Sequence, residues 1–399
     1  MENTSRGNRL HIGFYGKTNV GKSTLVNKIT KQEVSIVSEQ KGTTTDVVYK
    51  PMELLPIGPV VFMDTAGLDD GTELSKKRTQ KTISTIDKAD VTVIVCDFEG
   101  WDTVDFELAK KANEMKTPIL AVVTKNDIQK ISDEKLNEIK KFTENILFTG
   151  LEDKDPTSKF KAILTDILPP DFIENKTITG NLVNEKDTVI LVVPIDKEAP
   201  KGRLILPQVQ VLRELLDKNA HAIVVKETEL KSALSMLKKQ PDLVITDSQA
   251  FKEVSKIVPD NVPLTSFSIL FANYKGDIET FINGAKALNS LKDGAKILFL
   301  ESCTHHAIED DIARVKIPKL IENKTGKKFE YAYHSGCSLP DKITKYDLAI
   351  HCGACMTNGK EVLSRISKFK KSNIPITNYG IVIAFCLGIL DRATKLILK

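Results

Sequence analysis

Residues 16–23 of the chain read Gly16-Lys17-Thr18-Asn19-Val20-Gly21-Lys22-Ser23. An apolar run from Leu10 to Phe14 precedes this stretch, and a run with helical character, from Thr24 to Ile29, follows it. A glycine-rich turn between a strand and a helix, ending in Lys-Ser, is typical of a phosphate-binding loop. Backbone N–H groups and the helix start would surround the phosphates, Lys22 would reach the outer ones, and the Ser23 hydroxyl could ligate Mg²⁺.

Length and composition limit the number of domains and the class of partner. A chain of 399 residues should hold two or three domains. Its 57 basic and 53 acidic side chains nearly balance, so charge does not favour a nucleic acid as partner. Residues 1–9 lack the apolar core of a signal peptide, and the apolar segment 380–390 is too short to span a bilayer. We therefore expect a cytoplasmic protein without membrane contact, with 380–390 as a buried C-terminal helix.

Strand and helix patterns alternate through the first 170 residues, with a helical stretch at residues 74–88 among them. Such alternation predicts an α/β fold with a parallel, doubly wound sheet. The predicted strands are His11–Tyr15, Val47–Leu54, Val60–Met63, Val91–Cys96, Pro118–Val123 and Asn145–Phe148.

Two loops of this part offer ligands for the metal and the γ-phosphate. The threonine run 43–45 should form a switch loop, in which a hydroxyl such as that of Thr44 completes the Mg²⁺ shell. The sequence Asp64-Thr65-Ala66-Gly67 ends an apolar strand, which places Asp64 for the metal and the Gly67 amide for the γ-phosphate. Together with the phosphate loop, this spacing predicts nucleotide hydrolysis.

A third loop, Thr124-Lys125-Asn126-Asp127, follows an apolar strand and would contact the base. The Asp127 carboxylate could accept two hydrogen bonds from a guanine edge, and the Lys125 stem could lie along the base. This arrangement favours GTP over ATP.

These residues resemble the translation-factor-type GTPases, most closely the branch of tRNA-modifying and ribosome-assembly GTPases. Thr124 stands where that family has Asn, Leu68 stands where many members have a water-orienting Gln, and the second base loop is at most Thr149-Gly150. Asn19 matches the position that binds a potassium ion in some relatives, so the resemblance implies slow, potassium-stimulated hydrolysis. The nucleotide-binding residues that it implies are Gly16, Lys17, Thr18, Asn19, Val20, Gly21, Lys22, Ser23, Thr24, Thr124, Lys125 and Asp127.

A second, smaller α/β pattern runs from Thr188 to Pro263 and carries no chemical motif. Its strands are expected at 188–194, 222–225 and 242–246, and its helices at 209–216 and 230–238. Exposed edge strands of such a sheet could pair with a second copy, which suggests a homodimer.

The third part, from about residue 265, carries soft metal ligands. An apolar strand at 296–302 leads into Cys303-Thr304-His305, and another at 346–350 leads into His351-Cys352-Gly353-Ala354-Cys355. The carboxyl ends of parallel strands share one edge, so these ligands can converge. Three thiolates suit either zinc or an iron–sulfur cluster, and the spacing does not choose between them. The residues concerned are the thiolates Cys303, Cys352 and Cys355, with His305, His351 or Glu301 as a possible fourth ligand.

The whole chain resembles the HydF family, the maturation GTPases of FeFe-hydrogenases. Three features carry this resemblance: the asparagine in the phosphate loop, the motif-poor middle part, and Cys-x-His followed, after forty-five residues, by His-Cys-x-x-Cys. It implies that Cys303, Cys352 and Cys355 hold a 4Fe–4S cluster, with His305 and His351 at or near it. It further implies a scaffold that accepts a transient 2Fe precursor, built with radical-SAM maturases, and transfers it to apo FeFe-hydrogenase.

We therefore expect an N-terminal P-loop GTPase domain (1–170), a small α/β dimerisation domain (180–264) and a C-terminal α/β iron–sulfur cluster domain (265–399). The cofactors would be GTP, Mg²⁺, K⁺ and the cluster. The alternative is a ribosome- or RNA-associated GTPase with a structural zinc module at its C-terminus.

Overall fold

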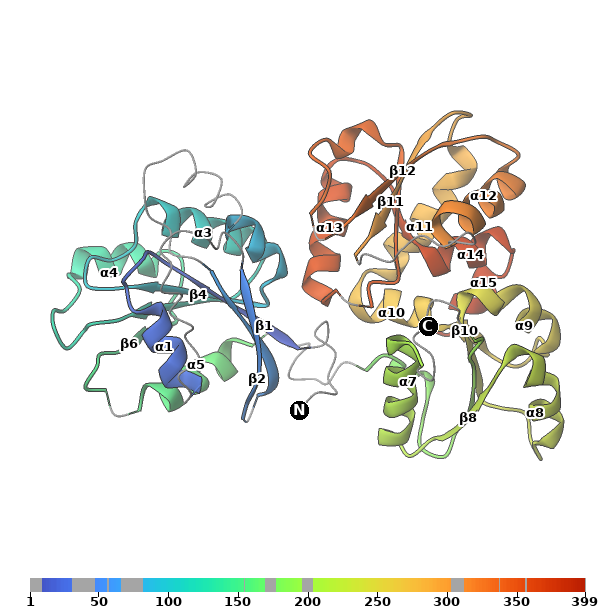
Figure 1. Cartoon of the computed structure of the whole chain (residues 1–399), viewed down its shortest axis with the longest axis horizontal. Coiled ribbons are helices and arrows are strands. Elements are labelled where there is room, and N and C mark those ends of the chain that lie inside the picture. Colours follow the sequence, from blue (N-terminus) through green and yellow to red (C-terminus); the bar gives the residue numbers. More distant parts are fainter. Residues whose placement is uncertain are drawn as a thin grey trace. The chain divides into compact units, whose positions relative to one another are not determined.

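The computed structural model of the chain divides into two compact units, residues 1–175 and 176–399. Both consist of parallel-stranded sheets between helices (Figure 1). The described residues are 9–30, 47–55, 57–65, 82–153, 155–168, 177–195, 204–302, 312–336, 338–355 and 357–398. Within those ranges every helix is too short or too polar to traverse a bilayer.

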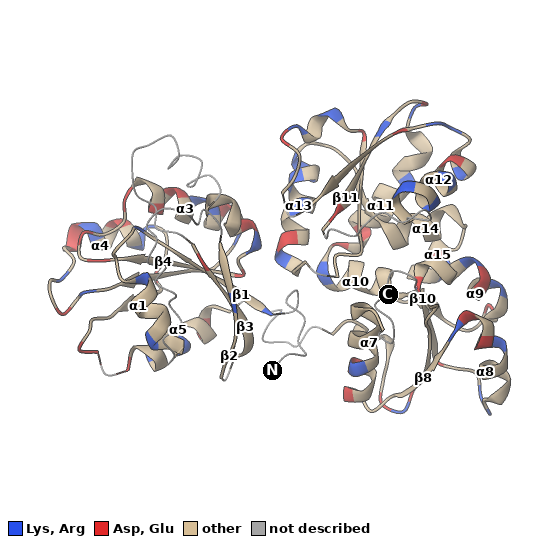
Figure 2. Ribbon diagram, viewed as in Figure 1, with Lys and Arg blue, Asp and Glu red and all other residues tan. Residues whose placement is uncertain are grey.

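The first unit contains a six-stranded sheet in the order β2-β3-β1-β4-β5-β6. Acidic and basic residues are mixed along its helices α3 and α4 (Figure 2). The strands are β1 (Leu10–Tyr15), β2 (Val48–Leu54), β3 (Gly58–Asp64), β4 (Val91–Cys96), β5 (Ile119–Val123) and β6 (Ile146–Phe148). The helices are α1 (Lys22–Thr30), α3 (Thr103–Glu114), α4 (Asp133–Lys140) and α5 (Pro156–Ile167).

Helices cover both faces of this sheet, which explains why its central strands are apolar on both sides. In β4, Val93 and Val95 pack in the cluster formed with α1 and α5, whereas Ile94 and Cys96 pack in the cluster formed with α3. All residues of β4 are buried. The predicted doubly wound α/β arrangement is thus present, and the phosphate loop leaves it at the carboxyl end of β1.

One strand differs from the predicted all-parallel sheet, because β2 pairs with β3 in antiparallel register. Only residues 55–57 separate the two strands. A parallel connection needs a crossover of about a dozen residues, so this short link permits only a hairpin. The predicted helix at 74–88 lies largely outside the described residues, of which 82–85 are helical and are followed by a 3₁₀ turn at Ile86–Lys88.

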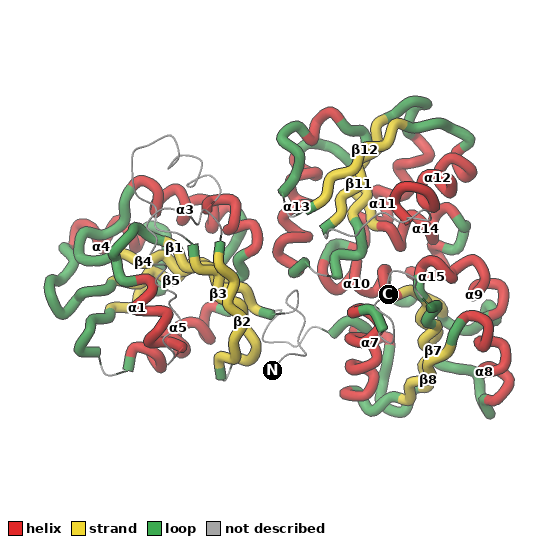
Figure 3. Tube along the Cα trace, viewed as in Figure 1, coloured by secondary structure: helices red, strands yellow, loops and turns green. Residues whose placement is uncertain are grey.

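The second unit contains two four-stranded parallel sheets, in the orders β10-β9-β7-β8 and β12-β11-β13-β14, with helices beside the strands (Figure 3). The first consists of β7 (Thr188–Val192), β8 (His221–Val225), β9 (Leu243–Thr246) and β10 (Leu264–Ser266), with α7 (Leu206–Asp217), α8 (Leu230–Met236), α9 (Phe251–Ile257) and α10 (Phe267–Lys275). The second consists of β11 (Lys296–Glu301), β12 (Glu330–Ser335), β13 (Leu348–His351) and β14 (Ile376–Asn378), with α11 (Ile278–Ala287), α12 (Ile317–Thr325), α13 (Gly359–Lys371), α14 (Tyr379–Cys386) and α15 (Leu390–Thr394).

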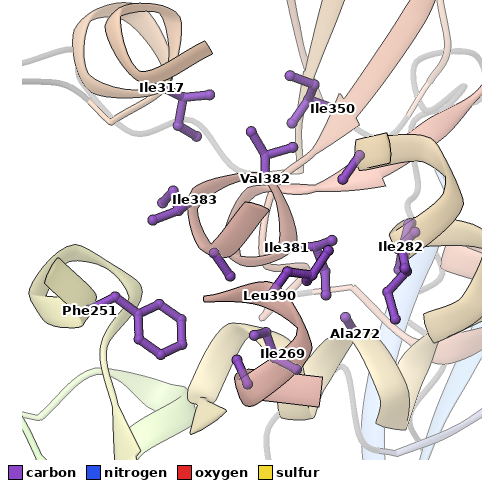
Figure 4. Close-up of a cluster of buried hydrophobic side chains, with 14 of the residues drawn as sticks. Phe251, Ile269, Ala272, Ile282, Ile317, Ile350, Ile381, Val382, Ile383 and Leu390 are labelled. Carbon is purple, nitrogen blue, oxygen red and sulfur yellow. The ribbon is translucent and has the colours of Figure 1, made fainter. Parts of the chain in front are cut away.

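A single apolar cluster joins the two sheets of this unit. Figure 4 shows Val382 and Ile383 of α14 among side chains that come from several other elements, including Phe251 of α9 and Ile350 of β13. Helix α14 is apolar all round, which fits a helix buried on every side. The two sheets therefore share one core.

Three features of this unit escaped prediction. Strands β10 and β14 have three residues each and run directly into helices capped by Ser266 and Asn378, so they show no periodicity of their own. The apolar segment 380–390 is not one helix: α14 ends at Cys386 and α15 begins at Leu390. Gly388 lies between them with φ of +75°, a conformation that ends helices.

Candidate functional site

The phosphate loop lies between β1 and α1, and its glycines are required by geometry. Gly16 has φ of +134°, and a Cβ atom there would lie 2.1 Å from the carbonyl oxygen of Val95. Gly21 has φ of +93°, which side chains rarely adopt. Asn19 has φ of +64°, in the left-handed region that asparagine tolerates better than most residues. The loop can therefore form only with small or permissive residues at these positions.

Lys22, the first residue of α1, closes the loop. Its ammonium donates to the carbonyl oxygens of Gly16 at 2.5 Å and Lys17 at 2.6 Å, and the residue is buried. Ser23 and Thr24 are exposed on the first turn of the helix. An ammonium held on the loop backbone, followed by exposed hydroxyls, is suited to phosphates and their metal ion.

Asp64 lies at the carboxyl end of β3, beside the start of the phosphate loop. The register pairs it with Phe14 of β1, and the Thr65 hydroxyl donates to the Phe14 carbonyl at 2.7 Å. The Asp64 carboxylate lies 3.6 Å from the Lys50 ammonium. Other residues predicted to act here, Thr44, Gly67 and Leu68, lie outside the described part of the chain.

A cavity of about 250 Å³ lies between the phosphate loop and the two base loops, with Asn19, Thr124 and Lys125 in its wall. Lys125 has its ammonium 3.0 Å from the carboxylate of Asp97, which fixes the direction of its stem. The Thr124 side chain points back toward the phosphate loop and β4. The residues predicted to contact a base are thus brought to one cavity.

Asp127 packs against the second base loop. Its carboxylate accepts from the N–H groups of Leu151 at 2.7 Å and Glu152 at 3.3 Å. Desolvation alone would raise the pKa of Asp127, but these N–H donors outweigh it and the pKa lies below its usual value. A Cβ atom at Gly150 would lie 2.3 Å from Cγ of Asp127. Glycine at position 150 is therefore what allows this approach.

Sequence reasoning missed Lys28, on the last turn of α1. Its ammonium donates to the carbonyl oxygens of Gly150 at 2.9 Å and Leu151 at 3.1 Å. The residue thereby fixes the second base loop to the helix that follows the phosphate loop. A lysine in an amphipathic helix usually faces solvent, so its sequence position carried no signal.

The cysteine turn, residues 352–355, directly follows β13. Because β13 pairs in parallel with β11, this turn leaves the same edge of the sheet as Ser302, the residue after β11. The Ser302 N–H lies 3.3 Å from Sγ of Cys352. Burial raises the pKa of Cys352, but His351 and the N–H groups of Ala354 and Ser302 lower it overall, to about 6. Cys352 is thus a thiolate at neutral pH.

The remaining predicted ligands Cys303 and His305 lie outside the described residues. Within the described ranges, three or more Cys, His, Asp or Glu side chains do not gather at any point as a metal site. Cys352 and Cys355 are both free thiols there.

Both described candidates for a fourth ligand already have partners. The Arg365 guanidinium can only donate, so His351 Nε2, 2.9 Å away, accepts, and Nδ1 carries the proton toward the Cys352 carbonyl at 2.8 Å. Glu301 receives the two terminal nitrogens of Arg314 at 2.9 and 3.1 Å. Either residue would have to leave these partners to bind a metal.

Lys275, the last residue of α10, was also missed. Only 3% of it is exposed, and its ammonium donates to the carbonyl oxygens of Ala354 at 3.0 Å, Cys355 at 3.3 Å and Thr357 at 2.8 Å. Burial lowers the pKa of Lys275 to about 8, and the charges of Cys355 and Cys352 oppose that change. At neutral pH the cysteine turn is therefore held by a buried positive charge.

Comparison with family models assigns three regions of the chain. Residues 178–276 match a model described as the hydrogen maturase F dimerization domain, and residues 279–396 match one described as the hydrogen maturase F tetramerization domain. These two matches cover more than half of the chain. Residues 11–125 match a model described as a 50S ribosome-binding GTPase.

Curated relatives match the first part alone. The tRNA modification GTPase MnmE of Prochlorococcus marinus (strain NATL1A) is 34% identical over 151 residues, which are 36% of this chain and 31% of that protein. GTPase Der of Clostridium botulinum (strain Loch Maree / Type A3) is 33% identical over 138 residues, 33% of this chain and 31% of that protein. The chain thus spans about a third of the length of these relatives.

Solved structures give a weaker comparison. A variant of Era from Aquifex aeolicus, bound to GDP and aluminium fluoride, is 20% identical and has a TM-score of 0.34. The match covers 54% of this chain and 93% of that one. This likeness is too low to carry any argument about the site.

Proposed function

The chain belongs to the HydF family of hydrogenase-maturation GTPases, and from this premise we propose a GTP-hydrolysing scaffold that carries a 4Fe–4S cluster. It receives a diiron precursor as cargo and transfers it to apo FeFe-hydrogenase. The observation that supports this most strongly is that one chain combines both hydrogen maturase F domains, a phosphate loop, and a turn with two thiols at the carboxyl edge of a parallel sheet.

For hydrolysis, each residue has a role that follows from its position. Lys22 binds the outer phosphates, Ser23 and Asp64 hold Mg²⁺ directly or through water, and Asp127 selects guanine. Thr44 and Gly67 are assigned to the metal and the γ-phosphate on sequence grounds. Asn19 is assigned to a potassium ion, whose charge would replace the group that Leu68 does not provide.

The cysteine turn fits an anionic, thiolate-bound group. Cys352 is a thiolate that receives an N–H donor from Ser302, as sulfur ligands of iron–sulfur clusters commonly do. Lys275 places a positive charge under the same turn. Cys352 and Cys355 would hold the cluster together with Cys303, with His305 or His351 near it. When bound, such a cluster supplies an iron that can take a further ligand, and one-electron redox chemistry.

Self-association and partner exchange complete the proposal. Residues 178–276 would form a homodimer and residues 279–396 would extend it to a larger oligomer, as the descriptions of the two matching models suggest. The division at about residues 170 and 264 stays a prediction. Radical-SAM maturases would load the scaffold, and GTP hydrolysis would time the release of partners by favouring one of two arrangements of the chain.

Anaerobic reconstitution of the full chain with iron and sulfide tests the cluster. The wild type should take up iron and sulfide and give the EPR signal of a reduced 4Fe–4S cluster, whereas Cys352→Ala should lose most of that signal. Cys386→Ala is the matched control, because Cys386 is another free thiol of the same unit. Equal loss in both variants, or no cluster in the wild type, would end the scaffold proposal.

A GTPase variant tests the other half. Lys22→Ala, confirmed to be folded, should fail to support hydrogenase activation when the scaffold is limiting. Activation equal to that of the wild type would show that GTP is not needed.

A second candidate function is a ribosome- or RNA-associated GTPase with a zinc-stabilised second unit. It is favoured by the match of residues 11–125 to the ribosome-binding GTPase model. Tightly bound zinc, with no iron after reconstitution, would support this candidate over the scaffold.

A further inference from the structure

The cation under the cysteine turn has an unusual set of partners. The three acceptors of the Lys275 ammonium are all backbone carbonyl oxygens of residues 354–357. Among the described residues, no carboxylate lies within ion-pair distance of it. Its remaining close contact is the Phe271 ring, whose centroid lies 5.3 Å from Nζ. Lys275 is therefore a buried charge neutralised by dipoles alone.

Such burial needs compensation. An ammonium removed from water without an anion costs several kcal/mol, even where hydrogen bonds satisfy its protons. The nearby groups that can supply negative charge are the thiols of Cys352 and Cys355, whose charges act on Lys275. A cluster bound by thiolates is itself anionic, so it would provide the anion that this lysine lacks.

We propose that Lys275 positions the cysteine turn and balances the charge of the group bound there, so that it sets the reduction potential of the cluster. The proposal rests on the cluster assigned under the proposed function. The turn contains Gly353, with open space around it, and Ala354, with φ of +53°, so its own backbone does little to fix its shape. Three hydrogen bonds from one buried donor supply that constraint.

Lys275 also connects two regions of the chain. It ends α10, within the residues that match the dimerization model, whereas its acceptors lie within the residues that match the tetramerization model. The shape of the cysteine turn is therefore tied to a helix of the neighbouring sheet.

The test compares three variants of the full chain after anaerobic reconstitution. Lys275→Met removes the charge and keeps the volume, Lys275→Arg keeps the charge, and Lys286→Met removes an exposed lysine of α11 as control. Iron and sulfide per chain are measured first, followed by a dithionite titration monitored by EPR. Circular dichroism and thermal unfolding of each apo-protein show whether it is folded.

Loss of the positive charge should make reduction about tenfold less favourable in Lys275→Met, which is about 59 mV more negative for a one-electron couple. Cluster occupancy should fall as well. Lys275→Arg should restore most of both quantities, and Lys286→Met should match the wild type. A lower potential or occupancy in Lys275→Met, restored in Lys275→Arg, supports the proposal.

Two results would overturn it. One is a Lys275→Met protein with the potential and occupancy of the wild type, and the other is a Lys275→Arg protein no better than Lys275→Met. If Lys275→Met does not fold, the Lys275→Arg potential decides, since retained charge predicts a value near that of the wild type. Absence of a cluster from the wild type itself would instead refute the proposed function.

Discussion

The Thr124 hydroxyl oxygen lies 2.5 Å from the carbonyl oxygen of Val20 and 3.0 Å from that of Cys96. One side chain thus joins the first base loop to the phosphate loop and to the end of β4. Threonine stands here in place of the asparagine of related GTPases, and its hydroxyl reaches the phosphate-loop backbone directly. The departure from the family motif therefore keeps a link between the two halves of the nucleotide site.

Replacing Thr124 by valine should weaken GTP binding about tenfold, because one buried hydrogen bond of about 1–1.5 kcal/mol is lost at unchanged volume. Thr124→Ser keeps the hydroxyl and serves as the control. Titration of each protein with a fluorescent GTP analogue gives the dissociation constants. Equal affinity of the valine variant and the wild type would mean that the link does not support binding.

Asn19 offers two explanations for its own presence, and a glycine variant separates them. Its φ of +64° suits either residue, so Asn19→Gly keeps the loop conformation and removes only the amide. We expect the wild type to hydrolyse GTP at least about tenfold faster in potassium than in sodium, and the ratio to fall toward one in Asn19→Gly.

Nucleotide affinity is measured in parallel for the Asn19 variant, so that weaker binding is not mistaken for loss of potassium dependence. Equal rates of the wild type in the two salts would remove the basis for a potassium site. A glycine variant that keeps the full ratio would leave Asn19 as a residue that only shapes the loop.

The long strands and the ligand-bearing loops were predictable because each has a local signal. β4 is apolar on both faces since helices cover both, and the phosphate loop needs glycine where its backbone turns. The family assignment, carried by spacing motifs, was confirmed by the matching domains. The antiparallel β2 was wrong in the prediction because the alternation of elements outweighed the short link at residues 55–57.

The charged residues that support each site could not be predicted. Lys275 and Lys28 act on carbonyl oxygens 79 and 122 positions away or more, and backbone acceptors carry no sequence signature. Lys275 also ends an otherwise apolar helix, where a lysine usually reaches solvent. The pairing of such residues depends on how distant elements pack, which a local pattern does not contain. The predicted ligands Cys303 and His305 stay predictions.

Asp105 of α3 should make the first unit less stable as pH rises. Burial and the neighbouring Asp102 raise the pKa of Asp105 from 3.8 to about 7. The folded state therefore binds the proton more tightly than the unfolded state. The resulting stability is fully present below pH 3.8 and is lost as pH rises through about 7. Between pH 5 and pH 8, the wild type should lose about 2–3 kcal/mol relative to Asp105→Asn, which does not titrate.

Trp101 makes this measurable for one unit alone, because it is the single tryptophan of the chain and is buried beside α3. Urea unfolding followed by its fluorescence gives the free energy at each pH. Glu107→Gln, an exposed acid on the same helix, is the control and should show no pH-dependent difference from the wild type. A constant difference between Asp105→Asn and the wild type from pH 5 to pH 8 would contradict the raised pKa.

Arg365 of α13 joins the ends of three strands and should be needed for both stability and cluster binding. Its guanidinium lies 3.2 Å from the Ser302 hydroxyl, 2.9 Å from His351 Nε2 and 3.1 Å from the Gly336 carbonyl oxygen. It also pairs with the buried Glu361 at 2.8 Å. Arg365→Met should cost about 3–5 kcal/mol, because it leaves a buried carboxylate without its partner.

The double variant Arg365→Met with Glu361→Gln separates the two roles of the guanidinium. Removing the stranded charge should recover part of the lost stability, measured by urea unfolding followed by circular dichroism, since contacting residues do not contribute additively. Cluster occupancy should stay low, because the link between the ends of β11, β12 and β13 is still missing. Recovery of both quantities would reduce Arg365 to the partner of Glu361. Recovery of stability alone would show that the arginine holds the cysteine-bearing edge of the sheet in the shape that binding requires.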